Sequence, residues 1–307
     1  MNILITGGGG YLGSLLVNKL LNLGYKIVIV DIFMWGIDPI LHFIEHKNLK
    51  IIKSDVRDIN KYKIELNKCD FIINLAAIVG YPACDANPSE ARSINVDAVK
   101  EITKNISKNQ VLIQASTGSS YGKVVEICDE NTPINPITLY GQTKAEAEKY
   151  ILEVNGISLR FATVYGISPR LRFDLFINEL VLNAVTKKYY VMYEPDARRT
   201  FLDVNDAIRG IVFSIDNSTK MVGSVFNLGD SSQNFTKREI AMLVKSKIDF
   251  LLHIAEFSKD KDERDYSVNY SKISELGYNS KVNLNDSIDN LIKVSNIWVE
   301  KNNYRNF

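Results

Sequence analysis

Short apolar runs alternate with amphipathic segments through the first half of the chain. Residues 2–6 form a mostly apolar run that is typical of a buried strand, and in residues 11–23 leucines recur at the spacing of a helix face. Further strands are predicted at residues 26–30, 49–52, 71–75, 111–115 and 158–161, with helices at 87–107 and 140–155 between the later ones. Strands that alternate with helices predict parallel βαβ units, so we expect an α/β fold with a doubly wound parallel sheet.

The alternation becomes irregular after about Tyr165. Residues 168–174 are expected to form a loop that contains proline and arginine, residues 175–186 a helix, and residues 200–215 a strand followed by a helix. The charged run 259–265 is typical of a solvated loop. Since no linker, repeat or low-complexity tract separates the halves, we expect the second half to pack directly on the first.

Composition excludes several classes of function. The chain has 307 residues, of which 46% are hydrophobic, and a net charge of +1, so no overall field favours nucleic acid or an acidic membrane. Met1 leads directly into the first apolar run without a basic segment, so we expect no signal peptide, and no run reaches the roughly 18 apolar residues of a membrane span. Cys69, Cys84 and Cys128 form no CxxC pair, which favours a cytoplasmic location.

A glycine-rich turn, Thr6-Gly7-Gly8-Gly9-Gly10-Tyr11-Leu12-Gly13, joins the first predicted strand to the first predicted helix. Glycines at positions 7, 10 and 13 match GxxGxxG, a respaced form of the dinucleotide fingerprint. Glycine permits a positive φ and lets the backbone approach a pyrophosphate, while the helix start supplies free N–H groups. We therefore predict that Gly7, Gly10, Tyr11, Leu12 and Gly13 bind a dinucleotide.

The acid that closes the second predicted strand indicates which dinucleotide. Asp31 can accept hydrogen bonds from an adenosine ribose diol and would repel a 2′-phosphate, which favours NAD over NADP. Asp55, with Val56 after it, follows the third strand and could reach the adenine amino group, although an aspartate there could equally cap a helix. A reductase that uses NADPH would need tight 2′-phosphate binding despite Asp31, and comparing the dissociation constants of NAD and NADP decides between them.

His42-Phe43-Ile44-Glu45-His46 matches the HxxEH pattern of some zinc sites. No third ligand is evident, and the segment connects two predicted strands. A surface helix is the better interpretation, and we predict no metal site.

Tyr140-Gly141-Gln142-Thr143-Lys144 is the most informative motif in the chain. Residues four apart share a helix face, and the ammonium of Lys144 favours the phenolate of Tyr140, whose ordinary pKa near 10 would make it a poor base. Tyr140 could then take a proton from a substrate hydroxyl, and Lys144 could hold the nicotinamide ribose. The stretch Ser116-Thr117-Gly118-Ser119-Ser120-Tyr121-Gly122 follows a predicted strand and offers hydroxyls for the same substrate oxygen.

With these motifs the chain resembles the extended short-chain dehydrogenases/reductases, in particular the NAD-dependent epimerase/dehydratase family that acts on sugar nucleotides. The resemblance spans nearly the whole length. Besides the motifs above, it rests on Asn74-Leu75-Ala76-Ala77, Asn95, residues 160–166, Arg199-Thr200-Phe201-Leu202-Asp203-Val204 and Phe226-Asn227-Leu228-Gly229.

The resemblance implies an NAD-binding Rossmann domain in residues 1–165, with a returning segment near 200–215, and a smaller α/β nucleotide-sugar domain in residues 166–307. It implies further NAD contacts at Leu75, Ala76, Ala77 and Asn95. By position, Thr117 corresponds to the family's catalytic Ser/Thr and Arg199 to its diphosphate-binding arginine. A homodimer or homotetramer is expected.

Further substrate contacts are predicted on the loop that enters the second domain and around the sugar. Arg170, with Arg172 near it, could clamp a diphosphate together with Arg199. The other candidates for substrate contact are Tyr81, Ser119, Asn178 and Arg264.

Three departures from the family pattern narrow the chemistry. The 4,6-dehydratases of the family carry Thr-Asp-Glu where this chain has Thr117-Gly118-Ser119, so elimination of water would lack its acid and base. Asn74 stands in place of a common histidine, and Thr163 in place of a common asparagine.

These observations favour an enzyme that uses NAD to oxidise C4 of a nucleotide-linked sugar. The segments Arg170-Leu171-Arg172-Phe173-Asp174-Leu175 and Lys237-Arg238-Glu239 resemble bacterial GDP-heptose 4-dehydrogenases of capsule biosynthesis, so GDP-heptose is the preferred substrate. The alternatives are a nucleotide-sugar 4-epimerase, which begins with the same step, and a non-catalytic NAD-binding regulator.

Overall fold

The computed structural model describes residues 1–255 and 265–297. Its main sheet has seven parallel strands in the order β11-β7-β5-β4-β1-β2-β3. Their bounds are Ser224–Leu228, Ile157–Phe161, Val111–Thr117, Phe71–Asn74, Asn2–Thr6, Lys26–Asp31 and Leu49–Lys53. The chain order reverses beside β1, which pairs with β2 on one side and β4 on the other. A crevice for a ligand is expected at the carboxyl ends of the strands at this point.

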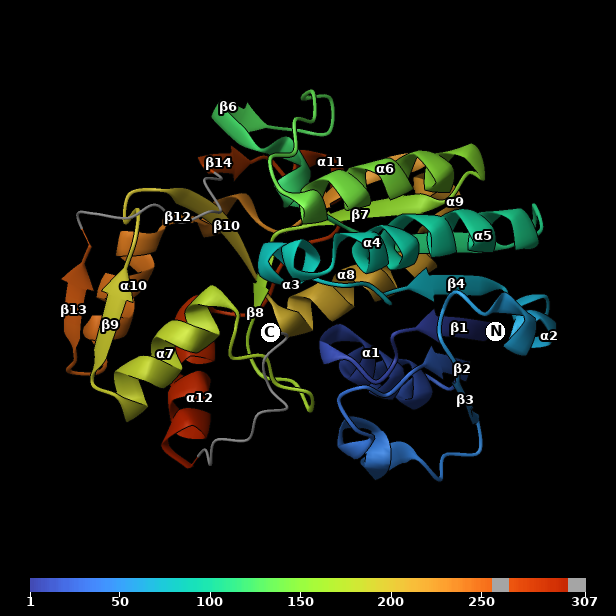
Figure 1. Cartoon of the computed structure of the whole chain (residues 1–307), viewed down its shortest axis with the longest axis horizontal. Helices are drawn as coiled ribbons and strands as arrows, with labels where there is room; N and C mark the ends of the chain where they lie inside the picture. Colours follow the sequence, from blue (N-terminus) through green and yellow to red (C-terminus); the bar gives the residue numbers. More distant parts are fainter. Residues whose placement is uncertain (256–264, 298–307) are drawn as a thin grey trace.

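Helices cover both faces of the main sheet (Figure 1). Leu16 and Leu20 of α1 and Ile208 of α8 pack on one face. On the other face Val99 of α5 and Ile151 of α6 pack against β1 and β4. The bounds are Tyr11–Asn22 for α1, Val204–Asp216 for α8, Pro88–Arg92 for α4, Ala98–Asn105 for α5 and Leu139–Glu153 for α6. Shorter helices are α2 Lys63–Leu66, α3 Tyr81–Ala86, α9 Ser218–Met221 and α11 Ser271–Ser274.

A smaller lobe lies beside the carboxyl ends of the main sheet (Figure 1). It has its own apolar core, in which Ile177, Ile240 and Ile288 are buried. Its elements are β8 Thr163–Tyr165, α7 Phe176–Thr186, β9 Tyr189–Met192, β10 Arg198–Asp203, β12 Asn234–Thr236, α10 Lys237–Lys245, β13 Leu251–Ile254 and α12 Leu284–Ile297. Elsewhere β6 Lys123–Cys128 pairs in parallel with β14 Asp265–Val268.

The predicted α/β fold with a doubly wound parallel sheet is confirmed. Each of the six strands predicted in the first half is present, with ends within two residues of the prediction. The strand and helix predicted at 200–215 are β10 and α8, although β10 begins earlier, at Arg198. Within the described residues, no helix combines the length and the apolar character that crossing a membrane requires.

Several local predictions were wrong. The sheet's last strand, β11, lies beyond the returning segment predicted near 200–215 and pairs with β7. The helix predicted at 87–107 is interrupted by a π-helical turn, Ser93–Asp97. The surface helix predicted for the HxxEH segment is present as a 3₁₀ helix, Asp38–Phe43, but it ends before Glu45 and His46. Residues 259–264 of the charged run lie outside the described residues. The last residue of the run, Asp265, is the first residue of β14.

Candidate active site

A cavity of about 620 Å³ opens at the carboxyl ends of the strands and is lined by residues of both lobes. Most of the residues predicted from the sequence to bind cofactor or substrate line it. These are Gly7, Gly10, Tyr11, Leu12, Gly13, Asp31, Asp55, Val56, Leu75, Ala76, Ala77, Tyr81, Thr117, Ser119, Tyr140, Lys144, Arg170 and Arg199. The exceptions are Asn95 and Asn178, while Arg264 lies outside the described residues.

The glycine-rich turn leaves no room for side chains at two of its positions. Gly7 has a φ of 73°, and a Cβ there would lie 2.7 Å from the backbone nitrogen of Ala76. A Cβ on Gly13 would lie 2.1 Å from the carbonyl oxygen of Gly7. Gly10 caps α1 without a side chain, so the N–H groups of the first turn face the cavity side of the helix start. This cradle fits the pyrophosphate of a dinucleotide.

The Gly13→Ala substitution should weaken NAD binding about 10- to 100-fold, because the added methyl group must displace the turn. Asn22→Ala is the control: Asn22 is exposed at the far end of the same helix, so we expect less than about a twofold change. Calorimetric titration with NAD measures both, and circular dichroism checks that each variant folds. Equal affinities for the two variants would contradict the proposed role of the turn.

Asp31 ends β2 at the adenosine side of this cradle. Its carboxylate accepts hydrogen bonds from the backbone N–H groups of Gly9 at 2.8 Å and Phe33 at 2.7 Å. Burial raises the pKa of this carboxyl, and the two N–H groups oppose the rise. Each oxygen keeps a lone pair for a ribose hydroxyl, so the group fits the predicted contact with NAD.

Asp55 lies at the cavity wall but is engaged with its own loop. Its carboxylate forms a salt bridge with Arg57 at 2.6 Å and accepts the backbone N–H of the same residue at 2.9 Å. The hydrogen bonds from Arg57 hold the pKa of Asp55 below its usual value. Asp55 thus closes its own turn, while the helix that follows begins at Ile59 with Asp58 at its N-cap, and a contact of Asp55 with adenine stays a prediction.

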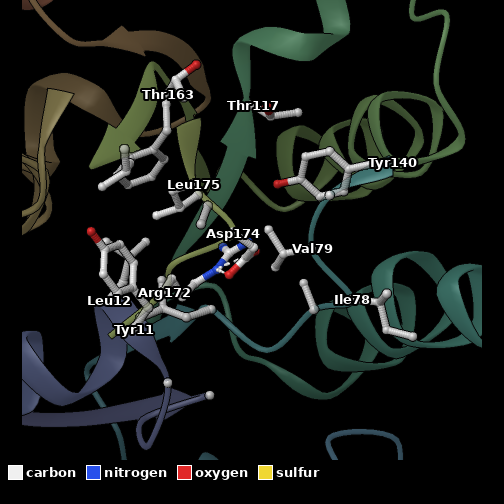
Figure 2. Close-up of a pocket in the computed structure, with 18 of the residues that line it drawn as sticks. Tyr11, Leu12, Ile78, Val79, Thr117, Tyr140, Thr163, Arg172, Asp174 and Leu175 are labelled. Carbon is white, nitrogen blue, oxygen red and sulfur yellow. Dashed lines mark hydrogen bonds and ion pairs between the residues drawn. The ribbon is translucent and has the colours of Figure 1, made fainter. Parts of the chain in front are cut away.

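The predicted catalytic residues meet across the cavity from two elements. Tyr140 lies in the first turn of α6, where the Thr138 side chain caps the helix, and Lys144 lies one turn further on. Thr117 ends β5, and Figure 2 shows Thr117 and Tyr140 on the same side of the cavity, with the Tyr140 hydroxyl directed into it. The Thr117 hydroxyl lies 3.0 Å from the Ser119 hydroxyl. A substrate hydroxyl held here would contact both a proton acceptor and an orienting hydroxyl.

Lys144 is buried, with 2% of its surface exposed, and donates a hydrogen bond of 2.9 Å to the carbonyl oxygen of Ala115 on β5. Burial lowers its pKa to about 8, so its charge is costly in this cavity. An ammonium in so apolar a place strengthens its effect on a neighbouring phenol, because the intervening dielectric is low.

The comparisons with known proteins agree with this geometry. Residues 3–229 match the model of the NAD-dependent epimerase/dehydratase family. The chain belongs to that family. It is therefore an NAD-dependent enzyme, as its sequence predicts, and NAD, when bound, supplies the acceptor for the hydride.

Two relatives of the family match over most of their length. A putative UDP-glucose 4-epimerase of Methanocaldococcus jannaschii is 26% identical, over 98% of this chain and 99% of its own. UDP-glucuronic acid decarboxylase 1 of Danio rerio is 28% identical, over 95% of this chain and 72% of its own. Among solved structures, UDP-glucuronic acid 4-epimerase from Bacillus cereus, in complex with UDP-glucuronic acid and NAD, has the same fold. The two structures superpose with a TM-score of 0.84 and 23% sequence identity. The match covers 96% of this chain and 99% of that chain.

Asn95 and Asn178 were predicted to contact NAD and substrate, but the structure places neither at the cavity. The side chain of Asn95 lies in the π-helical turn and exchanges hydrogen bonds with both backbone groups of Ile78, at 2.9 and 3.0 Å. The side chain of Asn178, on α7, bonds the backbone of Gly166 at 2.9 Å and of Arg172 at 2.8 Å. Both fix the loops that line the cavity, because a buried amide is stable only with such partners.

The two arginines of the loop before α7 differ in their surroundings. Arg172 forms a salt bridge with Asp174, whose side chain is 1% exposed, and Figure 2 places the pair in the middle of the cavity view. Arg170 instead stacks over the ring of Trp35, with its guanidinium carbon 4.4 Å from the ring centroid. Trp35 belongs to the segment after Asp31, so Arg170 reaches toward the adenosine side. Arg170 and Arg199 both line the cavity, and their diphosphate clamp stays a prediction.

The structure shows what surrounds three residues that depart from the family pattern, which are Gly118, Asn74 and Thr163. A Cβ on Gly118 would lie 3.1 Å from the Tyr266 hydroxyl and 3.4 Å from the carbonyl oxygen of Phe161. An acidic side chain at position 118 would therefore have to displace Tyr266. Asn74 joins two strands, since its amide donates to Gln114 at 2.7 Å and accepts from Thr6. Thr163 lines the cavity on β8.

Several cavity residues were missed by sequence reasoning. Trp35, Asp174, Glu179 and Lys237 line the cavity, and Lys237 donates a hydrogen bond of 3.1 Å to the carbonyl oxygen of Tyr193. Their only sequence signal was the resemblance of the segments around Asp174 and Lys237 to particular sugar-nucleotide enzymes. Among residues 1–255 and 265–297, no group of three His, Cys, Asp or Glu side chains is placed to hold a metal ion.

Proposed function

We propose that this protein interconverts C4 epimers of a UDP-linked sugar with NAD retained in the cavity. The observation that carries the proposal is the Tyr140–Lys144 pair beside the glycine-rich turn, together with the absence of carboxylates at positions 118 and 119. The nearly full-length match to a putative UDP-glucose 4-epimerase supports a UDP-sugar and an epimerisation.

The residues would act in two symmetrical halves. In the first half, Tyr140 as phenolate takes the proton of the C4 hydroxyl while C4 loses hydride to NAD, so the sugar becomes a 4-ketone and no outside oxidant is used. Lys144 stabilises the phenolate, and Thr117 holds the C4 oxygen throughout. After the ketone presents its other face, Tyr140 would return the proton to the oxygen, and C4 would regain the hydride that NAD had accepted. Arg199 and Lys237, buried at the second lobe's side, are proposed to bind the diphosphate.

The other readings have less support. A GDP-heptose 4-dehydrogenase would begin with the same proton transfer, but the two relatives described above, which match at least 95% of this chain, are named for UDP-sugars. A non-catalytic regulator would have no reason to keep the pair of Tyr140 and Lys144 at the cavity wall. A cytoplasmic location and a homodimer or homotetramer are kept as proposals.

The proposed reaction is tested by incubating the NAD-loaded protein with UDP-glucose, UDP-galactose, UDP-glucuronic acid and a GDP-heptose in parallel. We expect a UDP-sugar to reach an equilibrium mixture of C4 epimers by NMR, with no net gain in NADH absorbance. Stoichiometric NADH with a released 4-keto sugar would favour a dehydrogenase instead. Absence of turnover with all four sugars would overturn the proposed function.

A further inference from the structure

A row of buried hydrogen bonds crosses the carboxyl ends of the three central strands, β1, β4 and β5, and ends beside Lys144. The Thr6 hydroxyl donates to the side-chain oxygen of Asn74, whose amide donates to the side-chain oxygen of Gln114 at 2.7 Å. The Gln114 amide donates to the carbonyl oxygen of Ala115 at 3.2 Å, and the Lys144 ammonium donates to that same oxygen at 2.9 Å. The side chains of Thr6, Asn74 and Gln114 form the amide row, and each is at most 1% exposed.

The far end of the amide row lies against the glycine-rich turn. Thr6 directly precedes Gly7, and the Thr6 hydroxyl accepts the backbone N–H of Ala76 at 3.2 Å. Ala76 lines the cavity and is so close to Gly7 that a Cβ there would lie 2.7 Å from the Ala76 nitrogen. The amide row therefore joins the turn that fits a pyrophosphate to the lysine of the catalytic helix.

The hydrogen bonds of the amide row all point the same way, from Thr6 toward Ala115. An amide whose oxygen accepts a hydrogen bond donates more strongly through its nitrogen, so a row with one direction strengthens its last bond. That bond brings the partial positive charge of the Gln114 N–H to the oxygen that also accepts from Lys144, since a carbonyl has two lone pairs. The two donors share the electron density of one acceptor, and this weakens the hold of Ala115 on the ammonium.

The surroundings of Lys144 leave this carbonyl a large influence. In the part of the chain that the structure describes, the Ala115 oxygen is the one hydrogen-bond acceptor of the Lys144 ammonium. Cys84, on α3, is the titratable group whose charge opposes the lowering of the lysine's pKa by burial, and Tyr140 lies one turn earlier on the same helix. Two of the three N–H groups of the ammonium thus remain for the phenolate of Tyr140 and for a nicotinamide ribose.

We propose that Gln114 is a positioning residue for catalysis: its amide shares the Ala115 carbonyl with Lys144 and so leaves the ammonium free to act on Tyr140. Asn74 and Thr6 orient that amide and join it to the glycine-rich turn. Without Gln114 the ammonium would bind the carbonyl more tightly and stabilise the phenolate less. The inference rests on the proposed function for the role of Lys144, and it does not depend on which sugar is bound.

Gln114→Leu tests the proposal by NMR of protein that carries ¹³C-labelled lysine, without NAD or sugar. The Lys144 signal is the one that Lys144→Met removes, and its chemical shift follows the charge of the ammonium as the pH is raised. In the wild type we expect the midpoint near pH 8, because burial lowers the pKa of Lys144 to about 8. In Gln114→Leu the midpoint should rise by about one pH unit, since the carbonyl then binds the ammonium without a competing donor.

Gln110→Leu is the matched control. Gln110 is a second buried glutamine, directly before β5, and its amide donates to the carbonyl oxygens of Leu66 and Cys69 at 2.6 and 2.7 Å. Neither oxygen is the one that Lys144 shares, so the Lys144 midpoint should stay within about 0.2 pH unit. An equal rise in both glutamine variants would mean that any lost buried amide loosens the sheet, and the role given to Gln114 would be wrong.

A second variant interrupts the amide row at its first bond. Thr6→Val keeps the shape of the side chain but removes the donor to Asn74, so the Lys144 midpoint should rise in the same direction by a smaller step. This variant carries the test if Gln114→Leu does not fold. An unchanged or lower midpoint in folded Gln114→Leu would overturn the proposal. Since these titrations use no substrate, failure of the UDP-sugar reaction and failure of the positioning role are separate results.

Discussion

Replacing Tyr140 by phenylalanine should lower kcat about 10³-fold while NAD still binds. The substitution removes only the hydroxyl that is directed into the cavity (Figure 2) and leaves the ring that packs at the start of α6. Without the phenol, the Thr117 hydroxyl on the same side of the cavity is a poor substitute as proton acceptor, because a neutral hydroxyl is a weak base. The rate is measured by NMR conversion of the UDP-sugar, and NAD occupancy by titration.

The same helix provides the control for this substitution. Tyr150 lies later on α6, beside the ammonium of Lys100 at 5.2 Å from its ring centroid, and does not line the cavity. Tyr150→Phe removes the hydroxyl of a second tyrosine on the same helix, near the exposed ammonium of Lys100, and should change kcat less than about twofold. If Tyr140→Phe retained more than a tenth of the activity, Tyr140 would not be the proton acceptor, and the reading as a non-catalytic regulator would gain.

How much the sequence predicts depends on whether the signal is local. Tyr140 and Lys144 are found because their spacing fixes a shared helix face, and the glycine-rich turn because strand, turn and helix follow one another directly. Strand β11 was missed because its five residues include the polar Ser224 and Asn227, and so short a segment does not show which sheet edge it joins. That edge is set by packing beside β7, which only the folded chain shows.

The amide and arginine side chains show a second limit. Asn178 has the same hydrogen-bonding groups whether it meets a substrate or the backbone of Gly166, so residue type and position left both open. The stack of Arg170 on Trp35 joins segments far apart in the chain, and neither segment signals the other. Sequence reasoning therefore recovered the chemistry of the site better than the contacts that hold its parts together.

Lys144→Met should make the protein more stable at pH 7 and nearly inactive. Burial holds the pKa of Lys144 at about 8, below the 10.5 of an exposed lysine. At pH 7 the folded protein therefore carries a charge that water would solvate better, and methionine of similar length removes that cost. We expect the free energy of unfolding of the NAD-free protein to rise by about 1–3 kcal/mol at pH 7.

The gain should disappear as the pH rises. Between about pH 8 and pH 10.5 the unfolded chain binds a proton that the folded protein does not, so the wild type becomes more stable across this window. Urea unfolding at pH 7 and at pH 10 should therefore show a large difference between wild type and Lys144→Met only at the lower pH. Lys149→Met, an exposed position on the same helix, should stay within about 0.5 kcal/mol at both.

Activity should change in the opposite direction. Without the ammonium the phenolate of Tyr140 would lose the charge that is proposed to stabilise it, so kcat at pH 7 should fall about 10²-fold or more. A variant that is both more stable and inactive would show that the buried charge is kept for catalysis at the expense of folding. If Lys144→Met were instead equally destabilised at pH 7 and pH 10, the lysine would serve chiefly as a hydrogen-bond donor to Ala115, and its proposed effect on Tyr140 would lose its basis.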